Sequence, residues 1–340
     1  MEHNHLRSFE VSGFKKFTDL KIDNIGQFNL IVGQNNIGKS TLLEALLLSN
    51  NIEETLQGLI AGLIFRNIAF NNLEVNFFKG LFNKKDSFSY NLGYDTHKDS
   101  CLFEVRETSS LQQTEIDTLN LKNIGNRPLP YVGTLQVNNN KPEIDFIKNQ
   151  PGYSPYVSYK TDFAKDLFEF YSNNIQISKA VKEQFVNDLK LLIPDIENIE
   201  LGSIHGRDIS LIVTLKNTDT PITINDFGGG TIKYIRFLLE LFVCEDKRLM
   251  IDEIDTGIHY SKLSLMLTKI LSLAQKKNVQ LFTSTHSKEC IESFIKSLEE
   301  TGLQNEGRII RLAETKHGIK AYTMEFAEFE NALLAESEIR

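Results

Sequence analysis

The chain has 340 residues, of which 41% are hydrophobic and 24% charged, so it is long enough to bury a substantial core without disulfides. Its 23 phenylalanines and 10 tyrosines exclude an intrinsically disordered protein. The net charge of −8, with no run of more than two basic residues, argues against a face-wide grip on nucleic acid or anionic lipid, although a local patch for DNA contact stays open.

The first fifty residues are predicted to form strands, then a loop and a helix. Short apolar runs at 6–11 and 20–25 are typical of strands, and 28–32 is almost entirely apolar, as expected of a strand covered on both faces. A loop rich in glycine and asparagine follows. The apolar residues after it predict a helix over 38–48.

The middle of the chain is rich in asparagine, phenylalanine and lysine. Alternating segments at 87–92, 101–106 and 210–214 predict short strands, and a helix is predicted over 180–192, before Pro194. We therefore expect a core formed by 1–50 and 222–340, interrupted by a β-rich and partly helical inserted region over 51–221.

Residues 246–313 alternate between strands and helices. The predicted strands are 249–251, 279–283 and 307–312, and the predicted helices are 262–276 and 287–298, with apolar side chains on one face. Such alternation with short joints predicts an α/β fold with a mostly parallel sheet and flanking helices. An amphipathic helix for core packing or partner docking is predicted over 325–340.

The loop after the strand at 28–32 matches the pattern Gly-x-x-x-x-Gly-Lys-[Ser/Thr] of a Walker A phosphate-binding loop. Glycines let backbone N–H groups curl around a β-phosphate, and the positive end of the next helix points at the anion. Lys39 would reach the β/γ oxygens of ATP, and the Ser40 hydroxyl would ligate Mg²⁺. The predicted nucleotide-binding residues of this loop are Gly33, Asn35, Asn36, Gly38, Lys39, Ser40 and Thr41.

Two later strands end in polar residues suited to phosphate chemistry. The strand at 249–251 ends in Asp252 and Glu253, a Walker B arrangement in which Asp252 would hold Mg²⁺ and Glu253 would act as general base. His286 follows the next strand and, at the same carboxyl edge of a parallel sheet, is placed to contact the γ-phosphate or the water. Glu253 and His286 are thus the predicted catalytic residues, against the alternatives of a solvated strand end and a structural histidine.

A second glycine loop precedes a predicted helix over 231–243. It reads Asp226-Phe227-Gly228-Gly229-Gly230, and glycines before a helix N-terminus form an anion site, although a flexible turn is the alternative. One nucleotide cannot use both loops if they lie far apart. The second loop therefore suggests nucleotide binding across a dimer.

Together these motifs resemble the ABC-type P-loop ATPase heads of SMC-like and OLD (overcoming lysogenisation defect) proteins. The likeness rests on the opening Leu-Arg-Ser-Phe-Glu-Val-Ser-Gly-Phe-Lys-Lys-Phe at 6–17, the Walker A and glycine loops, 252–259 and 285–287. It implies two heads that sandwich two ATP molecules, each between one chain's Walker A and the other's signature loop.

The resemblance also assigns residues. It makes Asp226, Gly228 and Gly230 signature-loop residues, Asp255 the D-loop residue and His286 the switch histidine. Asp226 stands where the family usually has serine, which places a carboxylate near a γ-phosphate.

Neither a Toprim nuclease module nor a long coiled coil is expected in this sequence. It looks most like a standalone ATPase subunit of two-gene anti-phage systems. This implies a homodimer or larger oligomer that hydrolyses ATP and controls a separate nuclease-like or toxin effector in defence against phage or foreign DNA. An ATP-clamped scaffold with little hydrolysis is the alternative. A transporter ATPase subunit fits less well because of the modified signature loop and the insertion.

Other patterns are read as incidental or as indications of location. Residues 83–86 match the guanine-recognition pattern Asn-Lys-x-Asp but precede any Walker B candidate, the wrong order for a GTPase. Cys101, Cys244 and Cys290 are widely spaced, which predicts reduced thiols and neither a zinc site nor disulfides. With no signal-peptide core and no apolar run near the ~20 residues of a membrane helix, we expect a cytoplasmic protein with no membrane partner.

Overall fold

The computed structural model describes residues 5–329 except 52–53, 56, 60–80, 82, 84–86, 110–114, 124–133, 139–154, 159–166, 204–208, 217 and 219. Most of the helix predicted over 325–340 lies outside these residues, although 326–329 are helical. The three cysteines are buried, and none of them forms a disulfide in the described part of the chain. Among the described residues, no helix combines the length and the hydropathy needed to cross a bilayer.

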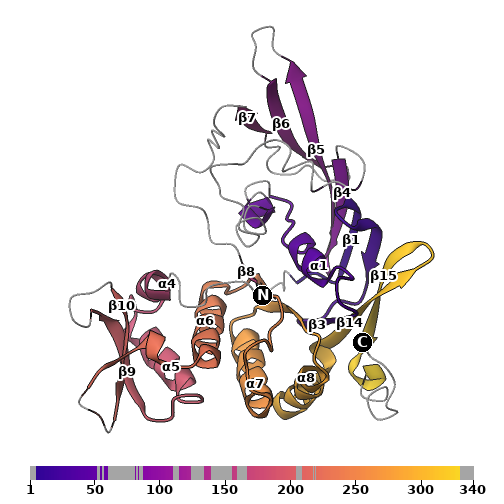
Figure 1. Cartoon of the computed structure of the whole chain (residues 1–340). Coiled ribbons are helices and arrows are strands. Elements are labelled where there is room, and N and C mark those ends of the chain that lie inside the picture. Colours follow the sequence, from indigo (N-terminus) through magenta and orange to yellow (C-terminus); the bar gives the residue numbers. More distant parts are fainter. Residues whose placement is uncertain are drawn as a thin grey trace.

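A six-stranded sheet with the order β15-β14-β3-β13-β12-β8 lies at the centre of the molecule (Figure 1). Its strands are β3 (Phe28–Val32), β8 (Tyr156–Val157), β12 (Arg248–Ile251), β13 (Gln280–Ser284), β14 (Gly307–Thr315) and β15 (Gly318–Glu325). All neighbours pair in parallel except β15, which returns antiparallel to β14. The predicted α/β fold with a mostly parallel sheet is confirmed, and β8 adds a strand from the predicted inserted region.

The central sheet separates two apolar cores because successive side chains of a strand point to opposite faces. In β3, Phe28, Leu30 and Val32 join one core, whereas Ile31 joins the other. Asn29 is buried as well, and its side-chain amide bonds to the backbone of Gly26. Coverage on both faces is the physical cause of the apolar run seen in the sequence.

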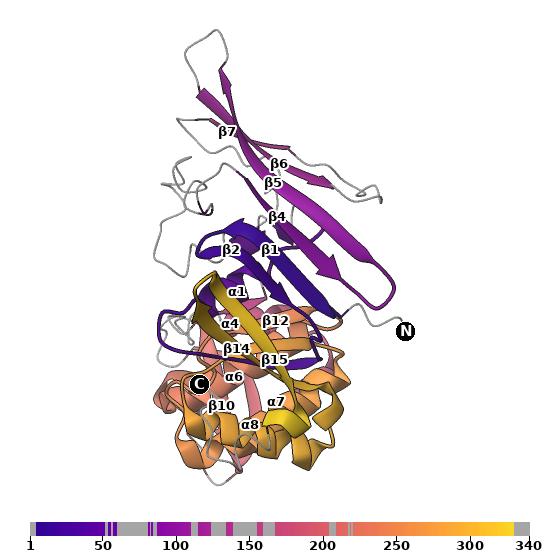
Figure 2. The same cartoon turned by 90° about the vertical axis from the view of Figure 1, so that its right-hand side faces the viewer.

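Helices cover the two faces unequally. The helices α6 (Gly229–Val243), α7 (Tyr260–Lys276) and α8 (Lys288–Thr301) pack on one face, and α1 (Lys39–Ala45) packs on the other. In Figure 2, α7 and α8 lie below the central strands and α1 lies above them. The helices predicted over 231–243, 262–276 and 287–298 are confirmed. The helix predicted over 38–48 is shorter in the structure, where α1 ends at Ala45. Just beyond this end, Arg248 donates to the carbonyls of Leu46 and Leu48, so these carbonyls are satisfied outside a helix.

A second, antiparallel sheet with the order β2-β1-β4-β5-β6-β7 covers α1 (Figure 2). Its strands are β1 (Ser8–Phe14), β2 (Phe17–Ile22), β4 (Ser87–Gly93), β5 (Lys98–Ser109), β6 (Glu115–Asn123) and β7 (Thr134–Asn138). Because β4 pairs with β1, one sheet combines strands from the first fifty residues with strands from the predicted inserted region. Phe9, Phe88 and Phe103 are buried in the core between this sheet and α1.

A third, smaller sheet lies beside α6 (Figure 1). It has the order β11-β10-β9, formed by β9 (Ile196–Gly202), β10 (Ser210–Leu215) and β11 (Ile222–Thr223). The helices α4 (Leu167–Asn174) and α5 (Lys179–Leu189) pack against it and against α6. From β11 the chain passes through the 3-10 turn η2 (Ile224–Asp226) directly into the glycine loop before α6.

Candidate functional site

The Walker A loop has the curled backbone that phosphate binding requires. Gly33 and Gly38 have φ of +144° and +118°, a region that glycine adopts readily, and Asn36 is left-handed at +61°. A Cβ on Gly33 would lie 2.7 Å from the carbonyl oxygen of Leu312 in β14. At the exposed apex of the loop, Lys16 Nζ donates to both the carbonyl and the side-chain oxygen of Asn36, each at 2.7 Å.

The remaining predicted residues of this loop lie where the motif requires them. Asn35 is exposed at the apex, and the helix α1 begins with Lys39, Ser40 and Thr41. Lys39 Nζ donates to the carbonyl oxygens of Gly33 at 2.8 Å and Gln34 at 3.0 Å, so its ammonium is held over the loop. Burial lowers the pKa of Lys39, and the nearby carboxylates of Asp252 and Glu253 oppose that shift.

The carboxylate of Asp252 is buried at the end of β12 with only 2% of the residue exposed. Its Oδ1 accepts a hydrogen bond of 2.5 Å from Ser284 Oγ, while Oδ2 is the one buried side-chain polar atom without a partner in the described chain. An orphaned carboxylate oxygen is costly unless a ligand completes it. Together with the Ser40 hydroxyl, this oxygen offers the hard donors that Mg²⁺ prefers, so the two residues fit the predicted ion.

Glu253 and His286 meet beside the Walker A lysine. Glu253 Oε1 lies 3.3 Å from His286 Nε2, and His286 Nδ1 lies 3.1 Å from Lys39 Nζ. Because the ammonium of Lys39 can only donate, Nδ1 accepts, and Nε2 then carries the proton that is donated to Glu253. Thr256 Oγ1 donates to the other oxygen of Glu253 at 3.1 Å. The structure thus joins the predicted catalytic pair to the nucleotide loop in one chain of contacts.

The segment that follows β12 is fastened to the end of β13. Glu253 N donates to Ser284 Oγ at 2.9 Å, and Ile254 N donates to the carbonyl of Ser284 at 3.1 Å. The carboxylate of Asp255, the predicted D-loop residue, accepts from Thr285 Oγ1 at 2.7 Å. These bonds fix the strand ends that carry Asp252 and His286 relative to each other.

Lys233 contacts the segment that carries Glu253, and the sequence analysis did not identify it. It lies on α6, is only 2% exposed, and its Nζ donates to the carbonyl oxygens of Glu253 and Thr256, each at 2.8 Å. Burial lowers its pKa to about 8, although Asp255 and Glu253 act in the opposite direction. A lysine one turn after the glycine loop, in a helix that is otherwise apolar on most sides, is the sequence signal that points to it.

The glycine loop and the Walker A loop of the same chain lead into different helices, α6 and α1. In the described structure α6 and α1 pack on opposite faces of the central sheet. A Cβ on Gly228 would meet no described atom within 4 Å, whereas one on Gly230 would lie 3.1 Å from the carbonyl of Gly257. The carboxylate of Asp226 turns back to accept from Thr223 N at 3.0 Å and Thr223 Oγ1 at 2.7 Å, which caps the η2 turn.

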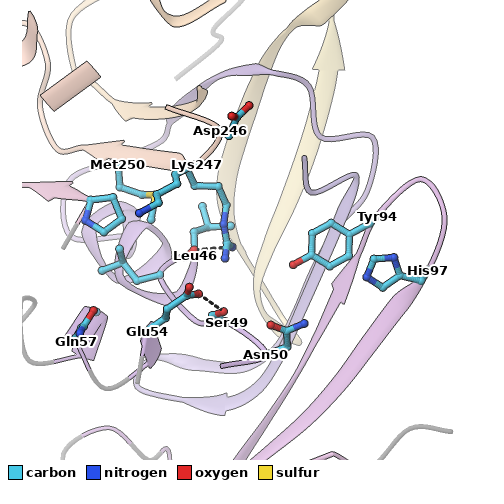
Figure 3. Close-up of a pocket in the computed structure, with 14 residues that line it drawn as sticks. Leu46, Ser49, Asn50, Glu54, Gln57, Tyr94, His97, Asp246, Lys247 and Met250 are labelled. Carbon is cyan, nitrogen blue, oxygen red and sulfur yellow. Dashed lines mark hydrogen bonds between the residues drawn. The ribbon is translucent and has the colours of Figure 1, made fainter. Parts of the chain in front are cut away.

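A cavity of about 650 Å³ lies at the C-terminus of α1 and the N-terminus of β12 (Figure 3). Tyr94, Asn50 and Lys247 line it, and Arg248 bonds across it to the end of α1. The Walker A loop is at the N-terminus of α1 and this cavity is at its C-terminus. The cavity is therefore distinct from the candidate nucleotide site.

A family model described as "AAA domain, putative AbiEii toxin, Type IV TA system" matches residues 28–292. The chain belongs to this family, AAA_21. It is 23% identical over 345 residues to an ATP/GTP phosphatase of Helicobacter pylori, covering 91% of this chain and 92% of that protein. The ATPase domain inferred from the sequence is confirmed at the level of the family, while the specific likeness to OLD proteins stays a prediction.

Solved structures of SMC heads share the fold. The SmcHead bound to the C-winged helix domain of ScpA matches with a TM-score of 0.53 and 12% identity, covering 96% of this chain and 99% of that one. The Smc head with an extended coiled coil bound to the C-terminal domain of ScpA, derived from Pyrococcus furiosus, matches with a TM-score of 0.50 and 12% identity, covering 98% and 99%. The fold is that of an ABC-type P-loop ATPase head.

Proposed function

We propose that this AAA_21 chain hydrolyses Mg-ATP to ADP and phosphate at a site completed by the glycine loop of a second head, and that this cycle controls a separate effector protein. The observation that carries the proposal is the continuous set of contacts Lys39–His286–Glu253 beside the orphaned oxygen of Asp252. A phosphate-binding lysine, a candidate base and a candidate metal ligand then share one site.

The geometry supports a mechanism for the hydrolysis. Backbone N–H groups of the Walker A loop and of the α1 N-terminus bind the phosphates, and Lys39 exchanges its carbonyl partners for β/γ oxygens. Ser40 and Asp252 would hold Mg²⁺, which would supply positive charge to offset that of the phosphates. Glu253 accepts a proton from the attacking water, whose oxygen bonds to the γ-phosphorus as the bond to the β–γ bridging oxygen breaks. His286 orients the Glu253 carboxylate through its Nε2 proton.

Two features support a second head in the site. The glycine loop stands at the N-terminus of α6, a helix of 15 residues, and backbone N–H groups at such an end favour an anion. Since α6 and α1 pack on opposite faces of the sheet, the anion is better supplied by another chain's nucleotide. Asp226, bonded to Thr223, contributes to the shape of the loop in this assembly.

The regulatory role is supported by the family and by its structural relatives. The family description names a toxin–antitoxin system, in which two components act together. The SMC heads above are bound to a domain of ScpA, so a head of this fold can dock another protein. We therefore infer that the effector is a separate nuclease-like or toxin protein in a phage-defence system. The ATP-bound or hydrolysing state of this chain would control its activity.

Mg-ATP binding and phosphate release, measured on the parent and three variants, test this function. Lys39→Ala should lose binding, and Glu253→Gln should bind Mg-ATP normally but hydrolyse at least 100-fold more slowly. Glu292→Gln, which replaces an exposed carboxylate on α8 by a carboxamide, is the matched control and should behave as the parent. If the parent binds Mg-ATP and releases phosphate no faster than Glu253→Gln, the ATP-clamped scaffold replaces the hydrolase.

A further inference from the structure

Lys233 bridges the glycine loop and the segment that carries Glu253. It is one turn into α6, directly after Gly228–Gly230, and its ammonium bonds to the backbone of Glu253 and Thr256 rather than to solvent. Burying a charged ammonium is costly, and an apolar side chain of the same length would fill the space without that cost. The two backbone bonds therefore indicate a role beyond packing.

Glu253 is held in an unusual conformation by bonds on both sides. Its φ of +50° lies in the left-handed region, which residues other than glycine and asparagine rarely adopt. Ser284 Oγ accepts from its N–H and Lys233 donates to its carbonyl, so both flanking peptide groups are fixed. Because the direction of the carboxylate follows from this backbone, loss of the Lys233 bond would release it.

The same helix touches the base-bearing segment at a second point. A Cβ on Gly230 would lie 3.1 Å from the carbonyl of Gly257 and 3.4 Å from Ile258 Cδ1, so the glycine loop packs directly on residues 257–258. A shift of Gly230 toward this segment would therefore press on the carbonyl of Gly257, four residues after Glu253.

We propose that Lys233 is a positioning residue that aims the Glu253 carboxylate and links it to the glycine loop of the same chain. When the loop engages a neighbouring head's nucleotide, α6 shifts Lys233 and with it the backbone of Glu253. Each head thereby adjusts its own base to the occupancy of its neighbour's site. This proposal rests on the proposed function, in which Glu253 is the base and the glycine loop caps a nucleotide in trans.

The test separates chemistry from binding in the full chain. Lys233→Met keeps the length of the side chain without its charge and should lower kcat at least 10-fold while the Kd for Mg-ATP changes less than twofold. Lys233→Arg should recover most of kcat, because a guanidinium also donates to two carbonyls. Lys269→Met, an exposed lysine on α7, is the matched control and should leave both quantities unchanged.

A second measurement does not depend on hydrolysis. Amide hydrogen exchange at 253–257 should be at least 10-fold faster in Lys233→Met than in the parent, with exchange in β3 and α8 unchanged. If the parent does not hydrolyse ATP, the proposed function fails, yet this exchange still reports whether Lys233 holds the segment. Unchanged exchange, unchanged kcat in Lys233→Met, or no recovery in Lys233→Arg would each overturn the proposal. Lys233→Gln, which keeps a donor, replaces the methionine variant if the latter does not fold, with an intermediate kcat expected.

Discussion

The Ser284 hydroxyl bonds to both residues that follow β12, Asp252 and Glu253, so the effect of its removal on the free energy of unfolding can be calculated. Its fully buried hydroxyl donates to Asp252 Oδ1 at 2.5 Å and accepts from Glu253 N at 2.9 Å. A hydrogen bond to a charged group contributes about 1.5–3 kcal/mol and a neutral one about 1 kcal/mol. Ser284→Ala should therefore lower the free energy of unfolding by about 3 kcal/mol, since both oxygens of Asp252 then lack a partner.

Urea unfolding of the parent and two variants measures this loss. Ser297→Ala is the control, because Ser297 is equally buried but its hydroxyl bonds to neutral partners, the carbonyls of Ser264 and Ser293 and the hydroxyl of Thr268, where about 1 kcal/mol is expected. Saturating Mg-ATP should stabilise Ser284→Ala more than the parent, since a bound cation compensates the buried charge of Asp252 that the variant leaves without a hydrogen-bond partner. The reasoning is refuted if Ser284→Ala and Ser297→Ala unfold at the same urea concentration, or if Mg-ATP stabilises Ser284→Ala no more than the parent.

The remaining predictions concern the nucleotide and the assembly. ATP should bind more tightly than GTP, because Asn83, the only described residue of the Asn-Lys-x-Asp pattern, already donates to Thr18. A tenfold preference for GTP in a competition titration, about 1.4 kcal/mol, would contradict this expectation. Mixing Lys39→Ala chains with Gly228→Trp chains should restore phosphate release that neither variant shows alone, since one competent site re-forms per mixed pair. Gly228 is the right position because a side chain there meets open space, whereas one on Gly230 would press on Gly257 in its own chain. No recovery in pairs that demonstrably associate would mean that the loop does not cap a nucleotide in trans.

The parts of the fold that were predictable are those set by local pattern. Both ends of the strand at 28–32 were predicted correctly because an apolar run bounded by turn residues is a local feature of the sequence. The Walker A loop could be located because its glycines and lysine lie within seven consecutive residues, 33–39. The pairing of β4 with β1 was not predicted, since register between strands some eighty positions apart leaves no local trace.

The candidate site divides in the same way. The proximity of Asp252, Glu253 and His286 was predictable because these residues follow apolar strands, and the parallel sheet then brings strand ends together. The direction of the Asp226 carboxylate was not predictable, because a capping bond to Thr223 competes with any contact to a phosphate and only the backbone turn decides between them. The contact of Lys233 was also hidden, since it depends on how α6 packs against a segment twenty residues later.

If two heads share their nucleotides as proposed, the division of the molecule into two cores limits the routes by which the nucleotide sites can be coupled. The central sheet places α1 and the Walker A loop on one face and the glycine loop with α6 on the other. A signal between them has to go around the carboxyl edge of the sheet, because the packed strands between the faces cannot rearrange independently. At that edge Glu253 points its carboxylate to His286 and Lys39, while its carbonyl bonds to Lys233. Glu253 thus has contacts toward both faces, and in the proposed dimer a change in the bond to its carbonyl is a short physical route from a neighbour's nucleotide to the proposed base.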